Sequence, residues 1–508
     1  MSVETELKLH IAAGHFPLLR RHPFLRALSV ARARTVGLYS VYYDTAGLKL
    51  HRHALALRLR RIGTRWVQTL KGGGQASAGL HQRNEWELPV ATERLDLEAL
   101  AAAGGVVPHA VRNHLQPVFV TDFSRTIRLL DFEGARIELC MDSGEIRAGQ
   151  SVFPISELEL ELKSGAPLQL FRLALALIDI VPLQVEHTSK AEHGYRLFAA
   201  GNPVPSKGSF PVLHKAQHTT VAVRAMIATC LAQVQANVPG VLLKLDEEYL
   251  HQVRVGLRRL RVVLGIARRV HDDTEAVALR EQVGRLCVDL GRAREWDVFV
   301  TQTLASLCAR MPEHAGLCGV LRASERRRKK VYAETVHRLG SADFQRMLLR
   351  FGAWLHGGHW PESDIPLKRF ALHILEKQHG RVIAQGVALK ENPAQLHALR
   401  IACKKMRYSA EMFGSLFANG RGKTYVAQLA AVQEALGALN DLAAAERLLL
   451  ELESRQRRDT LALIRGWIAL EYAGRIARFS VVWQRFAKKN GFWNGCHSAR
   501  PGAMQVKG

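Results

Sequence analysis

Cysteine is scarce in this sequence, and its few copies are scattered. The 508 residues include seven cysteines, none of them in C-x-x-C spacing. An odd number without paired spacing argues against a disulfide framework or a structural zinc site, and fits a reducing compartment. Long apolar runs are missing as well, since none approaches the roughly 20 residues that cross a bilayer. The N-terminal MSVETELKLH lacks the basic and apolar regions of a secretory signal. We therefore expect a cytoplasmic protein.

Negative charge is in short supply. The chain has 46 acidic against 71 basic residues, a formal net charge of +25, which favours polyanionic partners. The excess is unevenly spread, because residues 1–205 contain 24 basic and 20 acidic residues whereas the remainder contains 47 and 26. We therefore look for a polyanion-binding function first in the second part of the chain.

A segment rich in proline and glycine, residues 201–211, separates short alternating runs from long stretches with helical periodicity. Such composition is typical of a linker. We predict an α+β protein of two domains. A β-rich domain covers residues 1–205, a linker 206–217 and a helical domain 218–490, with halves at about 218–360 and 361–490, and residues 491–508 form a flexible tail.

Several short segments of the first domain alternate apolar with charged residues. They cover residues 3–9, 55–60, 66–71, 83–88, 137–142 and 157–163. Alternate side chains of a strand point to opposite faces, and one charged face most often meets solvent. Here, however, carboxylates share their face with Arg or Lys in strand after strand. A sheet closed on itself would gather these groups in one polar lumen. That lumen suits a phosphate chain held by cations, with a hard metal ion held by carboxylates.

One of these segments has a recognisable pattern. Glu4-Thr-Glu6-Leu-Lys8 resembles the E-x-E-x-K signature of the CYTH family, also called triphosphate tunnel metalloenzymes. Further segments accompany it in order: Tyr42–Thr45, Leu57–Arg60, Thr69–Lys71, Gly79–Arg83, Thr121–Arg125, Glu157–Leu162 and Ser189-Lys190. The resemblance covers roughly residues 1–200. It implies an eight-stranded antiparallel barrel around a charged tunnel that cleaves triphosphates with Mg²⁺, or with Mn²⁺.

The resemblance also implies roles for individual residues. Metal binding falls to Glu4, Glu6, Glu159 and Glu161. The catalytic set is Lys8, Arg58, Arg60, Lys71, Glu85 and Glu87, and the further substrate-binding residues are Arg83, Arg125 and Lys190. Glu138 and Asp142 are expected to point into the tunnel, and Glu157 is equally well a metal-linked or a structural residue. The family also includes thiamine and nucleoside triphosphatases and class IV adenylate cyclases, and these motifs do not separate the substrates.

The second domain contains an internal repeat. Residues 251–261 match residues 397–407 at an offset of 146, which indicates a duplicated helical unit. His251, Arg254, Arg258 and Arg261 are spaced by 3, 4 and 3 residues, and so share one face of a helix. The second copy repeats this face with His397, Arg400, Lys404 and Arg407. Cations crowded on one face repel one another, and a polyanion lying along them would relieve that repulsion.

The second domain resembles a CHAD domain over about residues 215–490. The resemblance implies that both basic faces bind inorganic polyphosphate, and the CYTH–CHAD order resembles the bacterial inorganic triphosphatases. We therefore expect an inorganic triphosphatase that uses Mg²⁺, with tripolyphosphate as substrate, inorganic polyphosphate as partner and polyphosphate granules as one location. A scaffold that binds polyphosphate without turnover is the alternative. Specific nucleic-acid binding is disfavoured, because only Tyr408 accompanies the basic faces and single-strand binders interleave aromatic residues.

Overall fold

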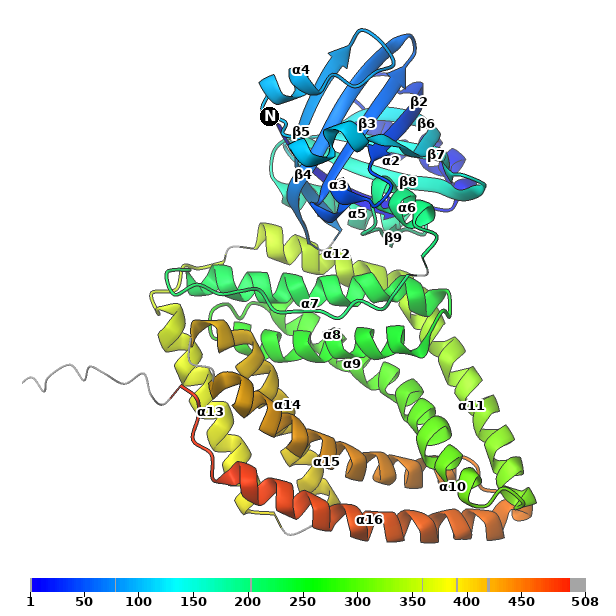
Figure 1. Ribbon diagram of the computed structural model, residues 1–508, viewed down its shortest axis with the longest axis vertical. Coiled ribbons are helices and arrows are strands. Elements are labelled where there is room, and N and C mark those ends of the chain that lie inside the picture. The colour runs from blue at the N-terminus through cyan, green and yellow to red at the C-terminus, as the bar shows by residue number, and fades with distance from the viewer. Residues whose placement is uncertain are drawn as a thin grey trace, which may run out of the picture. The chain divides into compact units, whose positions relative to one another are not determined.

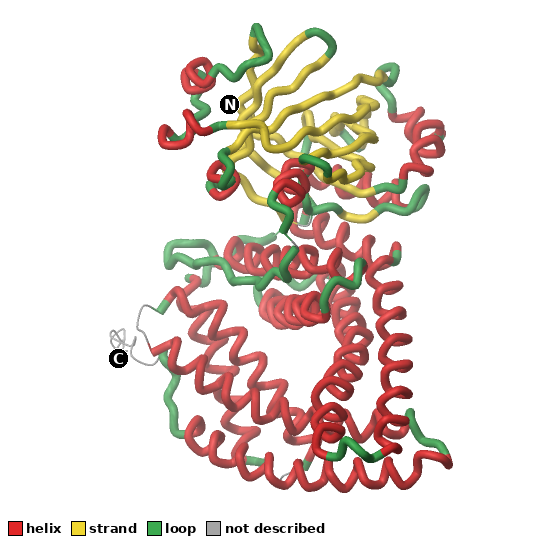
Figure 2. Tube along the Cα trace, turned by 45° about the vertical axis from the view of Figure 1, so that its right-hand side comes forward, coloured by secondary structure: helices red, strands yellow, loops and turns green. Residues whose placement is uncertain are grey.

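The computed structural model describes residues 2–77, 79–201, 203–358, 360–389, 392–417 and 421–493. Figure 2 shows that the strands are confined to the N-terminal part and that the rest is helical. The chain divides into two compact units. The first contains residues 1–207 with 231–253 and 338–359, and the second contains the remainder. The domain limits drawn from the sequence stay predictions.

Eight antiparallel strands close into a barrel, which confirms the predicted fold class. The sheet runs in the order β5-β4-β3-β2-β6-β7-β8-β1, and β1 also pairs with β5 (Figure 1). A short ninth strand, β9, pairs with β1. Their bounds are β1 Ser2–His10, β2 Arg34–Asp44, β3 Leu55–Ile62, β4 Arg65–Ser77, β5 Leu80–Val90, β6 Gln116–Phe132, β7 Ala135–Ala148, β8 Ser151–Ser164 and β9 Gln184–Val185.

The apolar faces of the strands point outward and are covered by helices. Leu7 and Leu160 are fully buried in a cluster with Phe171 of α5. Leu57 and Leu70 pack similarly with Leu100 of α4. The alternation therefore leaves the charged faces for the lumen. The helices around the barrel are α1 Phe16–Arg21, α2 Pro23–Leu28, α3 Lys49–Arg52, α4 Leu97–Ala102, α5 Pro167–Ile178 and α6 Lys190–Phe198.

Strand β4 is longer than its sequence indicates. The glycine run after Lys71 predicts the end of a strand, but β4 continues to Ser77. The register shifts between Gly72 and Gly74, and Gly73 has φ +55°. A β-bulge with a glycine in the left-handed region lets pairing continue past the kink.

The helical part contains α7 Thr219–Leu242, α8 Glu247–Ala267, α9 Thr274–Val298, α10 Ala305–Arg310, α11 Ala315–Gly340, α12 Ala342–Gly357, α13 Leu367–Val387, α14 Pro393–Phe413, α15 Arg421–Leu450 and α16 Arg458–Ala487. In the first unit α12 packs on α5 and β9, where Gln345 accepts a hydrogen bond of 2.9 Å from the amide of Val185. In the second unit α13, α14, α15 and α16 pack in succession.

Helix α7 is long and apolar enough to cross a bilayer by length and composition, but 61% of its apolar window is buried in the protein. A helix in the core of a protein can be equally long and apolar, so this composition is weak evidence for a membrane span. Most of the predicted tail, residues 494–508, lies outside the described residues. In the part that is described, Phe492 and Trp493 are buried, and each ring centroid lies 5.6 Å from that of Tyr425.

Candidate active site

Strand register brings charged residues together in the barrel lumen. On β1, Lys8 lies opposite Glu159 of β8, and Glu6 lies opposite Glu161. On its other side β1 places Glu4 opposite Arg83 of β5. Directly paired residues on neighbouring strands point to the same face, so the first strand of the chain meets charged residues on both sides.

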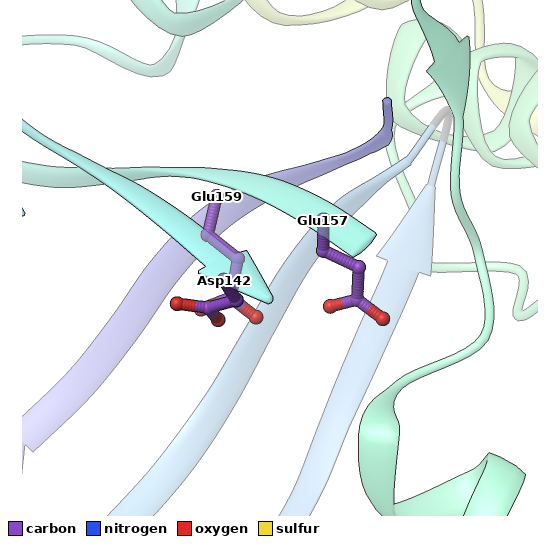
Figure 3. A group of neighbouring side chains, drawn as sticks. All are labelled: Asp142, Glu157 and Glu159. Atoms are coloured by element: carbon purple, nitrogen blue, oxygen red, sulfur yellow. The ribbon is translucent and has the colours of Figure 1, made fainter. Parts of the chain in front are cut away.

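Three buried carboxylates form the acidic centre of the lumen. Asp142 of β7 and Glu157 and Glu159 of β8 each offer an oxygen within 4.8 Å of the others (Figure 3). Lys190, at the start of α6, places its Nζ atom 2.8 Å from Asp142 and 2.9 Å from Glu159, and also contacts Glu157. Arg125 donates to both oxygens of Asp142, at 2.7 and 2.6 Å, and contacts Glu159. Cationic side chains therefore surround the carboxylates.

The pKa values of the two glutamates of this centre are shifted in opposite directions. Burial alone would raise the pKa of Glu159, but Lys190, Lys8 and Arg125 hold it well below its ordinary value. At Glu157 burial outweighs the attraction of Lys190 and Lys8, and its pKa is raised. Two neighbouring carboxylates with different proton affinity are a common arrangement at catalytic sites.

Lys8 joins the acidic centre to the signature strand. Its Nζ lies 2.9 Å from Glu6 and contacts Glu159. Burial favours its neutral form, but the charges of Glu159 and Glu6 raise its pKa above the ordinary value. Lys8 is therefore a fixed positive charge in the lumen.

Strands β2 to β5 carry the cationic side of the lumen. Lys71 contacts Glu4 and lies 3.3 Å from Glu85, and Arg58 lies 3.6 Å from the same Glu85. Burial, and next the neighbouring charge of Arg58, lower the pKa of Arg60 to about 9. The crowded cations of this wall are thus short of negative partners.

The lumen contains a cavity of about 70 Å³. Among the described residues, seven cations and three carboxylates line it: Lys8, Arg58, Arg60, Lys71, Arg83, Arg125 and Lys190, with Glu4, Glu6 and Glu159. A second cavity of about 280 Å³ shares Lys71 and Arg83 with the first and is also lined by His51 and Glu192. The inner cavity therefore has a cationic excess suited to a phosphate chain.

Of the residues predicted as catalytic, substrate-binding or metal-binding, three lie outside the lining of the inner cavity. Glu85 is reached through Lys71 and Arg58, and Glu161 is paired with Lys163 at 2.6 Å. Glu87 is exposed and accepts a hydrogen bond of 3.4 Å from Thr69.

The sequence assigned no role to Tyr42, although its segment was recognised. Tyr42 lines the cavity and is 5% exposed. Burial opposes ionisation of its hydroxyl, yet Arg58 and Arg60 lower its pKa. Alternation along β2 could have found it, because Tyr42 lies opposite Arg58 in the register. Ser189 also lines the cavity and caps α6.

The oxygen donors of the lumen fit a divalent metal. Mg²⁺ prefers carboxylate oxygens with water and substrate phosphates, and Asp142, Glu157 and Glu159 offer such oxygens within one small volume. Glu4 and Glu6 line the adjoining cavity. The cations that contact these carboxylates now supply the positive charge that a metal would supply.

In the helical part, the two repeated basic faces converge within the second unit. Burial, and then Arg400, Arg258 and Arg254, lower the pKa of Lys404 to about 6. Such an effect requires residues of α8 and α14 to lie close together. Within the described residues, Arg254 Nη1, Arg258 Nε and Arg400 Nε are buried without a hydrogen-bond partner.

The other members of the repeats are placed less uniformly. His397 Nδ1 lies 3.0 Å from Asn440 Oδ1, and Arg407 pairs with Glu411 at 3.5 Å. His251 precedes Arg254 by about one turn of α8 and belongs to the first compact unit. Arg261 faces a separate cavity, described below.

Known protein families match both the N-terminal barrel and the helical part of the chain. Residues 2–195 match the family model of the CYTH domain, and residues 225–450 match that of the CHAD domain. An inorganic triphosphatase of Haemophilus influenzae is 34% identical over 197 residues, or 39% of this chain. The chain spans only 55% of the length of that relative.

A solved structure resembles the helical part. The CHAD domain of the plant Ricinus communis covers 57% of this chain and 98% of its own, with 28% identity and a TM-score of 0.52. A Hippeastrum protein described as having a dominant triphosphatase activity covers 40% of this chain and 98% of its own, with 18% identity. Its TM-score of 0.29 is too low to support a conclusion. From the two family matches, the chain is a fusion of a CYTH domain with a CHAD domain.

Proposed function

We propose that the barrel hydrolyses inorganic triphosphate to diphosphate and phosphate with Mg²⁺, and that the helical domain binds inorganic polyphosphate. The observation that carries the proposal is the inner cavity, in which seven cations and three carboxylates line about 70 Å³. Neutral or singly charged substrates would leave this excess of charge unpaired. A triphosphate supplies several negative charges in a compact chain, and the relative from Haemophilus influenzae is named for this substrate.

The lumen residues have distinct tasks in this reaction. Arg58, Arg60 and Lys71 bind phosphate oxygens and stabilise the charge that develops on the diphosphate leaving group. Glu4 and Glu6 would hold the metal, together with oxygens of the acidic centre. When bound, the metal withdraws charge from the phosphoryl group and lowers the pKa of a nearby water. Water oxygen forms the new bond to phosphorus, the bridging P–O bond breaks, and the proton of water leaves to solvent or to a carboxylate.

Helix α6 completes the site at the acidic centre. Lys190 and Arg125 are held by the buried carboxylates, so their positive charges are oriented before substrate enters. Such preorganisation reduces the reorganisation needed in the transition state. When substrate and metal bind, phosphate oxygens replace part of the carboxylate partners of these cations.

Polyphosphate binding is supported by the convergence of the repeated basic faces. The buried charges of Arg254, Arg258, Arg400 and Lys404 disfavour one another in the free protein. A phosphate polymer would offset this repulsion. Binding would recruit the enzyme to polyphosphate in the cytoplasm, granules included.

The test is phosphate release from tripolyphosphate by the full chain with Mg²⁺, with Mn²⁺ and with EDTA. We expect release that depends on metal and is much faster than from ATP or thiamine triphosphate. Conversion of ATP to cyclic AMP would assign the tunnel to a cyclase instead. A folded protein that binds polyphosphate but releases no phosphate with either metal would be a scaffold, and the hydrolase proposal would be wrong.

A further inference from the structure

The two copies of the repeat differ at one position with a large electrostatic effect. Helices α8 and α14 both have 21 residues, and their bounds keep the offset of 146. Four residues after Arg407, α14 has Glu411. Four residues after Arg261, the equivalent position of α8 is Gly265. One half therefore has a carboxylate where the other has no side chain.

Glu411 of the second copy neutralises one arginine of each copy. Its carboxylate lies 3.5 Å from Arg407 and 3.6 Å from Arg259. Arg259 also contacts the carbonyl oxygen of Gly208, and its guanidinium lies 5.0 Å from the ring centroid of Phe210. The cations at this position are thus supplied with partners from the protein itself.

In the first copy, Gly265 lies beside a cavity. A Cβ atom built on Gly265 would meet no atom within 4 Å, and the residue lines a cavity of about 490 Å³. Seven arginine and lysine side chains line this cavity, from α8, the turn that follows it, α9, α13 and α14, and no carboxylate of the described residues does. They include Arg261, Arg280, Arg381 and Lys405.

Six of these seven cations form no ion pair within the described residues. Of the seven, only Arg268 has a recorded ion pair there, with Asp272 at 3.0 Å. The Nη1 atom of Arg280 is buried without a hydrogen-bond partner. Burial, and next the charges of Arg381 and Arg261, lower the pKa of Lys405. The cations that line the cavity therefore repel one another, and no carboxylate stands at Gly265 to offset that repulsion as Glu411 does in the other copy.

We infer that this cavity binds a short run of phosphoryl groups, and that Gly265 creates the site by leaving out the carboxylate of the repeat. The inference rests on the proposed binding of polyphosphate and assigns it a pocket in which only Arg261 belongs to the predicted basic faces. Cations on four helices surround the space, which favours a compact anion with charge in every direction. In the described part of the chain no aromatic residue lines the cavity, so the described lining lacks the stacking surface by which single-stranded nucleic acid is held.

The test restores the missing carboxylate. Gly265→Glu gives α8 the residue that α14 has, and the open space around Cβ together with the helix propensity of Glu should keep the fold intact. Gly474→Glu is the matched control, because Gly474 is exposed on α16 and its Cβ would also meet no atom within 4 Å. Both variants keep the barrel unchanged, so tunnel binding contributes equally to each.

Binding of tripolyphosphate and of long-chain polyphosphate is measured by calorimetry at one fixed salt concentration. We expect Gly265→Glu to weaken polyphosphate binding at least about tenfold and to reduce its salt dependence, with Gly474→Glu equal to the parent. A loss for both probes identifies free short chains as ligands, and a loss for the long chain alone identifies a segment of a polymer. Phosphate release and the circular dichroism spectrum should be unchanged in both variants.

Other outcomes separate the two proposals. If the parent protein binds no polyphosphate, the proposed function of the helical domain fails. If the parent binds and Gly265→Glu binds equally well, the inference about this cavity is overturned. Displacement of polyphosphate by single-stranded DNA at equal phosphate concentration would also overturn it. Glu411→Gln, which removes the carboxylate charge beside Arg259 and Arg407, should strengthen polyphosphate binding, and unchanged or weaker binding would contradict the role given to this position.

Discussion

The Nζ atom of Lys190 lies 2.9 Å from Glu159 and 2.8 Å from Asp142, so a lysine from α6 occupies the centre of the barrel's carboxylates. A divalent metal at these oxygens would compete with that ammonium group. Lysine and metal therefore oppose each other in the free protein, and a phosphate chain that draws Lys190 away would favour metal binding.

Lys190→Met should separate metal binding from turnover. Removing one partner of a buried ion pair destabilises by about 3–5 kcal/mol, so we expect a lower melting temperature without metal. Mn²⁺ should bind more tightly than in the parent and recover much of that loss, while phosphate release falls at least about tenfold. Thermal shift with and without Mn²⁺ checks this, with Lys163→Met as control. Weaker Mn²⁺ binding in Lys190→Met would refute the competition.

The signature glutamates should be needed for the reaction and dispensable for the fold. Residues that only contact a metal ligand already change affinity or activity by about 10–100-fold. Glu4 and Glu6 would be ligands themselves, so Glu4→Gln or Glu6→Gln should lower phosphate release by more than about 100-fold. Glu145→Gln, a partly exposed residue of β7 paired with Arg147, should leave release unchanged. Kinetics across a Mg²⁺ titration give the answer, and activity that survives in both variants would remove Glu4 and Glu6 from the metal site.

Binding of polyphosphate should take up protons. Burial and neighbouring arginines lower the pKa of Lys404 from 10.5 to about 6, so the free side chain is largely neutral at pH 7.5. A bound polyanion raises that pKa toward its ordinary value, and uptake of about one proton follows between these two values. Affinity should therefore fall as pH rises from 7.5 to 9, where the phosphates are already ionised.

Calorimetry in buffers of different ionisation enthalpy measures this proton uptake. Lys404→Arg keeps its charge throughout the range, so its binding should show little dependence on buffer. Equal uptake by the parent and by Lys404→Arg would exclude Lys404 as the group that titrates.

The bulge of β4 should be sensitive to a single methyl group. A Cβ on Gly74 would lie 2.2 Å from the carbonyl oxygen of Gln82, a backbone atom that cannot move freely. Gly74→Ala should therefore cost about 1–3 kcal/mol of unfolding free energy. Gly37→Ala, where the added Cβ meets no atom within 4 Å, is the control. Urea unfolding compares them, and equal midpoints would show that the bulge tolerates a side chain.

Alternation in the sequence was enough to predict most of the strands and which of their residues share the charged face. Every segment chosen for alternating charge lies in a strand, and the side chains of Glu4, Glu6 and Lys8 reach one cavity. A period of two determines which residues share a face, and the family resemblance supplied the closure of the sheet. The alternation and the family motifs could be found because each lies within a short stretch of the sequence.

Contacts that depend on docking were harder to predict. Lys190 reaches Glu157 only because α6 packs on the strands, and no period in the sequence encodes that distance. The repeat predicted two basic faces, but the convergence of Lys404 with Arg258 depends on how the helices cross. The exchange of Glu411 for Gly265 was visible in the sequence, yet its meaning required the cavity beside it.

Closure of the barrel by its first strand also has a consequence for biosynthesis. Lys8 and Glu159 are 151 residues apart in the chain, and β1 pairs with β8 only after both have left the ribosome. Contacts of such long sequence separation slow folding. Until then β1 has only β5 as a possible partner within the barrel, and the carboxylates for the metal stay apart. The emerging chain should therefore have no triphosphatase activity before β8 emerges, and an extension at the N-terminus that hinders β1 would delay the site as a whole.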